Sequence, residues 1–126
     1  MNPDFSDLIG KPYRCRGRGP EGYDCFGLVR EVERRYGTEI PDYDYRGADA
    51  LPGKSDEEIG RGRAVKIPEP VPGSMILFGN SRGLNTHIGV YVGDGMFIHC
   101  TMREGVRVER LGPRMGTVSG VYVWQS

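Results

Sequence analysis

Apolar residues recur at helical spacing in one stretch of the first third of the chain. They lie three or four positions apart, with charged side chains at most positions between them: Phe26, Val29, Val32 and Tyr36. Such a stripe predicts an amphipathic helix that packs one face against a core.

Residues that favour helix ends flank this stripe. Asp24 precedes it, and its carboxylate can accept a hydrogen bond from a free amide of the first turn. Gly37 follows it, and glycine commonly ends a helix. The helix is therefore expected to begin at or next to Cys25, where the partial positive charge of a helix start would stabilise a thiolate.

A shorter pattern precedes this helix. Asn2 as a cap and Pro3 at the first position predict a short helix that Gly10 ends. The residues expected to face inward from it are Phe5, Leu8 and Ile9. Residues 11–22, which are rich in glycine and arginine, are expected to be irregular.

After Pro72-Gly73 the pattern becomes that of β-strands. Apolar runs and alternating segments predict five strands, at residues 75–79, 86–92, 96–101, 106–111 and 119–124. Gly93-Asp94-Gly95 between the second and third strands is a strong hairpin signal. Helices followed by an antiparallel sheet predict an α+β domain.

A long stretch, Ile40 to Pro72, separates the main helix from these strands. It is rich in proline, glycine, aspartate and tyrosine, and only Ser55–Ile59 resembles a helical turn. Connections of this length in small domains are usually functional, so we interpret it as a flap beside the site.

Length and charge narrow the class of protein. The 126 residues suit a single domain, assigned to residues 1–126. Basic and acidic residues number 17 each, so no excess charge favours a nucleic acid or an anionic membrane as partner. No stretch approaches the ~20 apolar residues that span a bilayer. No secretory signal follows Met1, so we expect synthesis in a reducing cytoplasm, with the three cysteines as free thiols.

The only two histidines both fall in the predicted hairpin. His87 lies seven residues before Asp94 and His99 five residues after it, which makes them diagonal neighbours across two strands. Adjacent strands are ~4.8 Å apart, so the rings can form a hydrogen bond. Together with Cys25 they form a candidate set of nucleophile, base and orienting group.

Two other interpretations compete with catalysis. Buried cysteines are more often inert core residues, and hairpin histidines are usually structural. A zinc site is the second alternative, with five potential ligands: Cys15, Cys25, His87, His99 and Cys100. Their spacing matches no C-x-x-C or H-x-x-x-H pattern, so we expect no metal and no organic cofactor.

The motifs as a set resemble the NlpC/P60 cysteine peptidases, papain-like enzymes that cut peptides of the bacterial cell wall. The matching segments are Lys11-Pro12-Tyr13, Asp24-Cys25-Phe26-Gly27-Leu28-Val29, Pro72-Gly73-Ser74, His87-Ile88-Gly89-Val90-Tyr91-Val92-Gly93 and Phe97-Ile98-His99-Cys100. They occur in the family's order and cover most of the chain. The resemblance implies a papain-like NlpC/P60 fold, with N-terminal helices packed on an antiparallel sheet of about five strands.

The resemblance also implies roles for individual residues. Cys25 is the nucleophile, His87 the base and His99 the third polar residue. Tyr13 matches a tyrosine whose hydroxyl lies near the nucleophile and polarises the scissile carbonyl; alternatively it is only a packed aromatic residue. The implied reaction is cleavage of peptidoglycan stem peptides at the γ-D-glutamyl–diamino acid bond.

Some positions depart from the family pattern. Phe26 replaces a serine and Ser74 an aspartate, while Cys15 and Cys100 stand where tryptophan and a small residue are common. Phe26 would either narrow the groove or pack the helix. The arginines before the nucleophile would bind stem-peptide carboxylates or form a solvated basic loop. The candidate substrate-binding residues are Arg14, Asp24 and Phe26.

The stretches Gly17–Cys25 and Ile40–Tyr43 resemble the branch of the family found in tailed phages and prophages. That branch implies a tail component that opens the cell wall, with peptidoglycan peptides and other phage tail proteins as partners. Its location would be the cytoplasm during synthesis and then the virion tail. The alternatives are a tail-assembly protein with a relic site, or a papain-like amidase or acyltransferase acting on another substrate.

Overall fold

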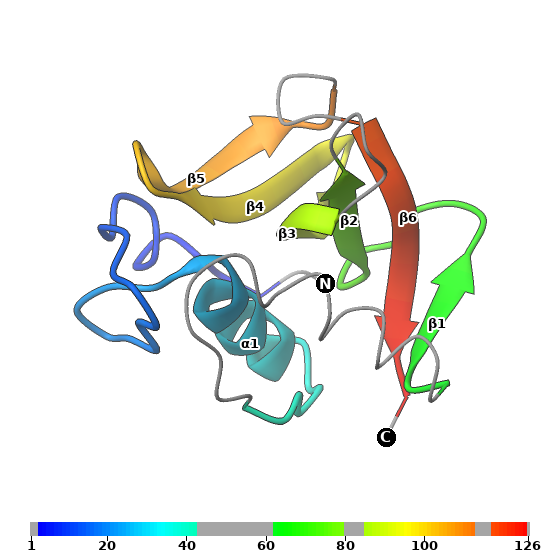
Figure 1. Cartoon of the computed structure of the whole chain (residues 1–126), viewed down its shortest axis with the longest axis horizontal. Coiled ribbons are helices and arrows are strands. Elements are labelled where there is room, and N and C mark those ends of the chain that lie inside the picture. Colours follow the sequence, from blue (N-terminus) through cyan, green and yellow to red (C-terminus); the bar gives the residue numbers. More distant parts are fainter. Residues whose placement is uncertain (1–2, 43–61, 80–84, 113–116, 126) are drawn as a thin grey trace.

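The computed structural model describes residues 3–42, 62–79, 85–112 and 117–125. These residues form helix α1 (Cys25–Arg35) and a six-stranded antiparallel sheet with the order β1-β6-β2-β3-β4-β5 (Figure 1). The strands are β1 (Ala64–Ile67), β2 (Met75–Gly79), β3 (Asn85–Gly93), β4 (Met96–Thr101), β5 (Gly105–Arg110) and β6 (Thr117–Trp124). The predicted α+β class is confirmed, with one strand more than expected.

Helix α1 begins and ends where the sequence predicts. The Asp24 carboxylate accepts a hydrogen bond from the Gly27 amide at 2.6 Å, which caps the first turn. At the other end Gly37 has a φ of +94°, a left-handed conformation that glycine adopts without strain. The predicted stripe packs into the core through Phe26, Val29 and Val32, and Tyr36 packs against its edge.

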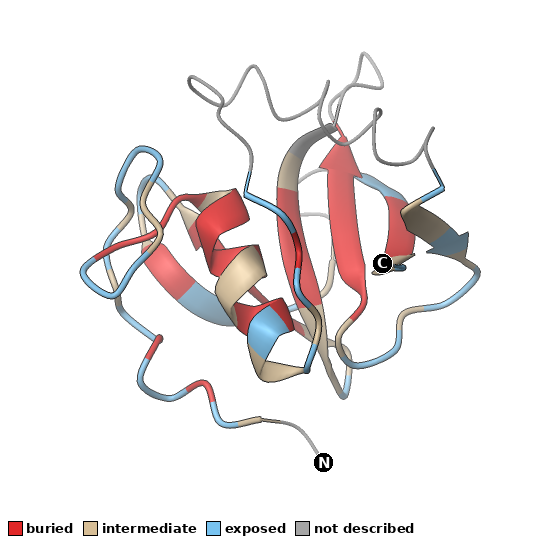
Figure 2. Ribbon diagram, turned by 90° about the horizontal axis from the view of Figure 1, so that it is seen from below, coloured by how far each residue is buried: buried red, intermediate tan, exposed pale blue. Residues whose placement is uncertain are grey.

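The sheet separates two apolar clusters. On one face, Ile88 and Val90 of β3 and Ile98 of β4 pack with the apolar side of α1. On the other face, Phe78 and Phe97 belong to a second, smaller cluster. Figure 2 shows α1 lying across the buried strands of the first face. Because side chains alternate along a strand, neighbouring residues of β4 therefore belong to different clusters.

The predicted N-terminal helix is wrong. Residues 6–10 form turns, and the Asp4 carboxylate accepts a hydrogen bond from the Ser6 amide at 2.9 Å. Such side-chain bonds compete with helix formation. Of the residues expected to face inward, Phe5 and Leu8 are buried but Ile9 is 47% exposed. The expected cap, Asn2, lies outside the described residues.

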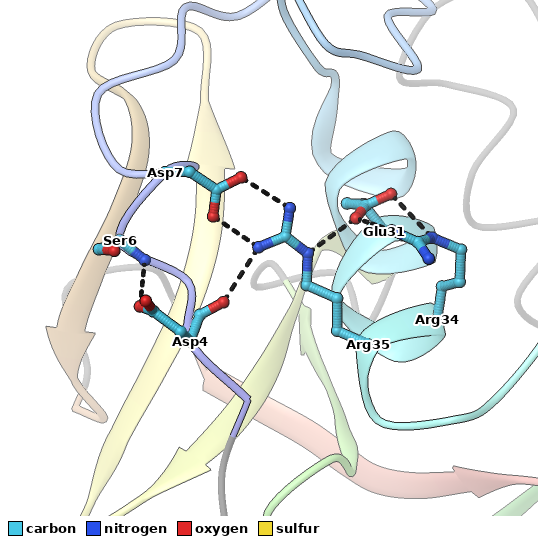
Figure 3. Close-up of polar contacts among 6 residues, drawn as sticks. All are labelled: Asp4, Ser6, Asp7, Glu31, Arg34 and Arg35. Atoms are coloured by element: carbon cyan, nitrogen blue, oxygen red, sulfur yellow. Dashed lines mark hydrogen bonds and ion pairs between the residues drawn. The ribbon is translucent and has the colours of Figure 1, made fainter.

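Arg35 ties this N-terminal segment to α1. Its guanidinium donates two hydrogen bonds to the Asp7 carboxylate, at 2.6 and 2.8 Å, and one to the Asp4 carbonyl at 3.0 Å (Figure 3). The same guanidinium bonds to Glu31 within the helix. The Arg35 contact lowers the pKa of Asp7 to about 2. A bidentate pair of this kind fixes orientation as well as distance, so the segment lies along the helix.

The interpretation of Ile40–Pro72 as one connection needs correction. Residues 64–67 form β1, which pairs with the last strand from Ala64 opposite Trp124 to Ile67 opposite Val121. The turn expected near Ser55–Ile59 lies outside the described residues. In the part of the chain that the structure describes, no helix is long and apolar enough to cross a membrane.

Candidate active site

Cys25 occupies the first position of α1, as predicted, and the segment before it holds that position tightly. Asp24 is only 3% exposed. Its carboxylate accepts one hydrogen bond from the Gly27 amide and another from Arg18 Nη1 at 3.0 Å. A Cβ on Gly27 would lie 2.0 Å from the Gly17 carbonyl oxygen. The loop therefore lies directly on the helix start, and only glycine fits at that position.

The Cys25 thiol is not the stabilised thiolate that the sequence predicts. Although the residue is only partly buried, burial of the thiol is the largest influence and raises its pKa to about 12. The Asp24 carboxylate raises it further, and the backbone amides of the first turn only partly offset both effects. The sulfur therefore carries its proton at neutral pH and needs a base before it can attack.

The two imidazoles meet as predicted. His87 Nε2 and His99 Nδ1 are 2.8 Å apart, with the rings in an edge-to-face arrangement. A Cβ on Gly89, which lies on β3 two residues after His87, would lie 2.9 Å from Phe97 Cδ2 and 3.3 Å from His99 Cβ. The absence of a side chain at this position leaves room for the ring pair.

A third group, which the sequence pattern alone does not reveal, completes this cluster. Glu109 Oε2 lies 2.5 Å from His99 Nε2. His99 pairs with Arg107 across β4 and β5, and Glu109 follows two residues later on the same face. Alternation in residues 106–111 predicts a strand, but its register against β4, which decides whether Glu109 reaches His99, cannot be derived from sequence spacing.

Cys25 packs against the apolar cluster below α1, whereas the two imidazoles contact Phe78 and Phe97 of the second cluster. Cys100 packs in the cluster below α1 and its thiol donates to the Tyr23 carbonyl oxygen at 3.2 Å. His99, one residue earlier, contacts Phe97 on the other face. Among the described residues, no hydrogen bond joins the Cys25 thiol to either imidazole. The pairing of Cys25 with His87 therefore stays a prediction.

The Tyr13 hydroxyl lies within electrostatic reach of the Cys25 thiol, and the role that the family resemblance implies for it stays a prediction. Burial is the main cause that raises the pKa of its hydroxyl, and the Cys25 thiol is the next. Tyr13 also forms a parallel bridge with Tyr23, two residues before the nucleophile. Its ring packs against the main core, so it is both a packed aromatic residue and a neighbour of the thiol.

The candidate substrate-binding residues differ in their surroundings. Arg14 is exposed and forms an ion pair with Glu21 at 3.1 Å. Phe26 is buried in the core, with the Arg18 guanidinium 5.5 Å from its ring centre, so it packs the helix. Arg18 also donates to Asp42 at 2.9 Å, which ties the loop before α1 to the segment that follows the helix. In the described ranges, no group of three or more His, Cys, Asp or Glu side chains is placed to hold a metal.

Comparison with known proteins adds an independent line of argument. Residues 10–122 match the model of the NlpC/P60 family. A probable endopeptidase of Mycobacterium tuberculosis is 31% identical over 91 residues, which are 72% of this chain and 20% of that protein. The gamma-DL-glutamyl hydrolase of Bacillus subtilis is 30% identical over 95% of this chain and 27% of its own length. The chain thus spans less than a third of either relative.

Solved structures agree on the fold. NlpC2 from Trichomonas vaginalis superposes with a TM-score of 0.69 at 25% identity, over 94% of this chain and 44% of that one. The NlpC/p60 domain of the peptidoglycan hydrolase SagA gives a TM-score of 0.57 at 27% identity, over 83% of this chain and 81% of that one. The matched region includes the helix that begins at Cys25 and the strands that carry both histidines. The chain therefore belongs to the NlpC/P60 family.

Proposed function

We propose that this protein is a thiol hydrolase that cleaves peptide bonds in peptidoglycan stem peptides. The observation that carries the proposal is the hydrogen-bonded imidazole pair, His87 and His99, in a family domain whose helix α1 begins at a cysteine. Relatives over most of this chain are named as endopeptidases and as a gamma-DL-glutamyl hydrolase. Both names describe hydrolysis of an amide bond, which a cysteine and a histidine can perform together.

In the proposed reaction the Cys25 sulfur attacks the scissile carbonyl carbon as His87 takes the thiol proton. A base is needed at this step because the pKa of the thiol is about 12. The C–N bond then breaks, and His87 gives its proton to the leaving amine. Water attacks the thioester as His87 accepts a proton from it, and the S–C bond breaks to release the acid. His87 then returns the proton to the sulfur and restores the thiol.

Two further residues assist the proposed steps. The hydrogen bond between His99 Nδ1 and His87 Nε2 orients the ring of the base. The Tyr13 hydroxyl lies near the thiol, where it can donate a hydrogen bond to the carbonyl oxygen as negative charge develops there. The chemistry requires no metal and no organic cofactor.

The proposed bond is the one between γ-D-glutamate and the diamino acid of the stem peptide. The name of the Bacillus subtilis relative, which matches 95% of this chain, supports a γ-glutamyl substrate. Arg14 is exposed at the segment before the nucleophile, where it can bind a free carboxylate of the stem.

We also propose that the protein acts as a component of a phage or prophage tail, with other tail proteins as partners. The support is the likeness of Gly17–Cys25 to the tailed-phage branch of the family. The protein would be made in the cytoplasm, would not insert into a membrane or bind nucleic acid, and would act on the wall from the virion. Mass spectrometry of purified particles tests this role, since absence of the chain from them would refute it.

Digestion of purified peptidoglycan, with the products identified by mass spectrometry, tests the proposed reaction. The wild type should release fragments cut at a stem-peptide bond, and Cys25→Ala should fold normally and release none. Cys15→Ala, which removes an exposed thiol, is the matched control and should keep the activity. Full activity in Cys25→Ala would refute the assignment. No release by the folded wild type would instead favour a relic site or another substrate.

A further inference from the structure

We propose that Glu109 is a positioning residue that acts through His99 to set which nitrogen of His87 is basic. This inference rests on the proposed function, because it assigns Glu109 to the same reaction. It extends the site from β3 and β4 to β5, a strand whose sequence predicts no site residue.

The geometry forms a continuous chain of three groups. Glu109 Oε2 lies 2.5 Å from His99 Nε2, and His99 Nδ1 lies 2.8 Å from His87 Nε2. His99 is fully buried and the Glu109 side chain is 17% exposed. Both contacts are short enough to be hydrogen bonds, and burial strengthens a network of this kind.

The proton positions follow from the chemistry of the groups. An ionised carboxylate only accepts hydrogen bonds, so His99 must carry its hydrogen on Nε2. A neutral imidazole has one N–H, which leaves His99 Nδ1 as an acceptor. His87 must then donate from Nε2, and its Nδ1 is the nitrogen without a hydrogen. One carboxylate thus selects the tautomer of both rings, and that tautomer can take the thiol proton at Nδ1.

Without Glu109 the opposite arrangement becomes accessible. His99 can then carry its hydrogen on Nδ1 and donate it to His87 Nε2. His87 would hold its own hydrogen on Nδ1, which cannot accept a proton from a thiol. The carboxylate also stabilises positive charge on the ring pair after proton transfer, because it lies within hydrogen-bond distance of one ring.

The ring tautomers can be measured directly, because the chain contains only two histidines. Nitrogen-15 NMR of histidine-labelled protein reports the protonation of each ring nitrogen, and a His99→Gln variant assigns the two rings. In the wild type near neutral pH, both rings should carry hydrogen on Nε2. In Glu109→Ala both rings should show mixed tautomers. Glu104→Gln is the matched control, since its carboxylate pairs with Arg107, and it should leave the spectra unchanged.

The cleavage rate provides the second readout. Glu109→Ala should lower kcat about 10- to 100-fold with little change in KM, less than the ~10⁴-fold loss when the wrong tautomer is enforced in a serine triad. Glu109→Gln keeps an acceptor oxygen but no charge, so it should keep the tautomers. It should still lose about tenfold in kcat and shift the acidic limb of the pH–rate profile to lower pH.

The outcomes separate this inference from the proposed function. Wild-type tautomers and wild-type kcat in Glu109→Ala would overturn the role of Glu109 while leaving the peptidase assignment intact. If Glu109→Ala does not fold, Glu109→Gln decides, and behaviour identical to Glu104→Gln overturns the proposal. If the wild type cleaves nothing, the proposed function fails, yet the NMR comparison still tests whether Glu109 sets the tautomers.

Discussion

The start of α1 depends on one carboxylate, so substitution of Asp24 is a direct test of how the cysteine is positioned. Asp24→Ala removes an oxygen that accepts from the Gly27 amide at 2.6 Å and from Arg18 Nη1 at 3.0 Å. Asp24→Asn keeps an oxygen that can cap the helix but removes the negative charge. The pair of variants therefore separates the capping contribution from the ion pair.

The expected losses follow from these contacts. Removing an N-cap side chain costs about 1 kcal/mol. A hydrogen bond to a charged group contributes about 1.5–3 kcal/mol, and the lower value applies because Arg18 keeps its contact with Asp42 at 2.9 Å. Asp24→Ala should therefore destabilise the fold by about 2–3 kcal/mol, and Asp24→Asn by about 1–1.5 kcal/mol. At the usual unfolding entropy per residue, Asp24→Ala should lower Tm by about 8–12 °C.

Urea unfolding followed by circular dichroism measures the two free energies of unfolding. Asp42→Asn is the control, because it removes the other carboxylate that binds Arg18 without touching the helix start. A loss below about 0.5 kcal/mol in Asp24→Ala, or one equal to that of the control, would refute the reasoning. A second readout is independent of stability. Asp24→Asn should lower the pKa of the Cys25 thiol, since the Asp24 carboxylate raises it.

Two further predictions concern protons on buried groups. Iodoacetamide should alkylate exposed Cys15 first and Cys25 and Cys100 slowly, because burial raises the pKa of their thiols to about 12 and about 11. Peptide mapping measures the order, and fastest labelling of Cys25 near pH 6 would reveal a thiolate that contradicts it. Burial also raises the pKa of Glu33 from 4.5 to about 8. The carboxyl ionises near pH 4.5 in the unfolded chain but only near pH 8 in the folded one, so the folded state is fully favoured below pH 4.5 and loses stability as pH rises to about 8. Glu33→Gln should therefore gain Tm relative to the wild type between pH 5 and pH 8, and parallel Tm profiles would contradict this.

Local patterns predicted the parts of the fold that local interactions determine. The apolar stripe, Asp24 and Gly37 specify α1 within one segment, and Gly93-Asp94-Gly95 specifies the hairpin. Strand β1 was missed because only four residues pair, and their partners on β6 lie near the other end of the chain. Nothing in residues 64–67 themselves indicates that pairing.

In the candidate site, too, local patterns predicted some features, and others depended on distant contacts. Counting residues from Asp94 was sufficient to bring His87 and His99 together, since both lie on one hairpin. Glu109 depended on the register of a second strand pair, and the thiol pKa depended on the packing around Cys25. The rule that a helix start favours a thiolate was outweighed by burial and by the same carboxylate that caps the helix. Glu33 lies among the charged residues between the apolar positions of α1, yet it is only 2% exposed, and no local pattern distinguishes it from its more exposed charged neighbours.

The alternation of β4 limits how this domain can diverge. Ile98 and Cys100 fill the core below α1, while Phe97 and His99 belong to the opposite side. Deleting or inserting a single residue within the strand would exchange these two sets, placing an imidazole in the apolar interior and an aliphatic chain beside Glu109. Evolutionary changes of length are therefore expected in the turns at either end of β4, whereas the strand itself should change only by substitution.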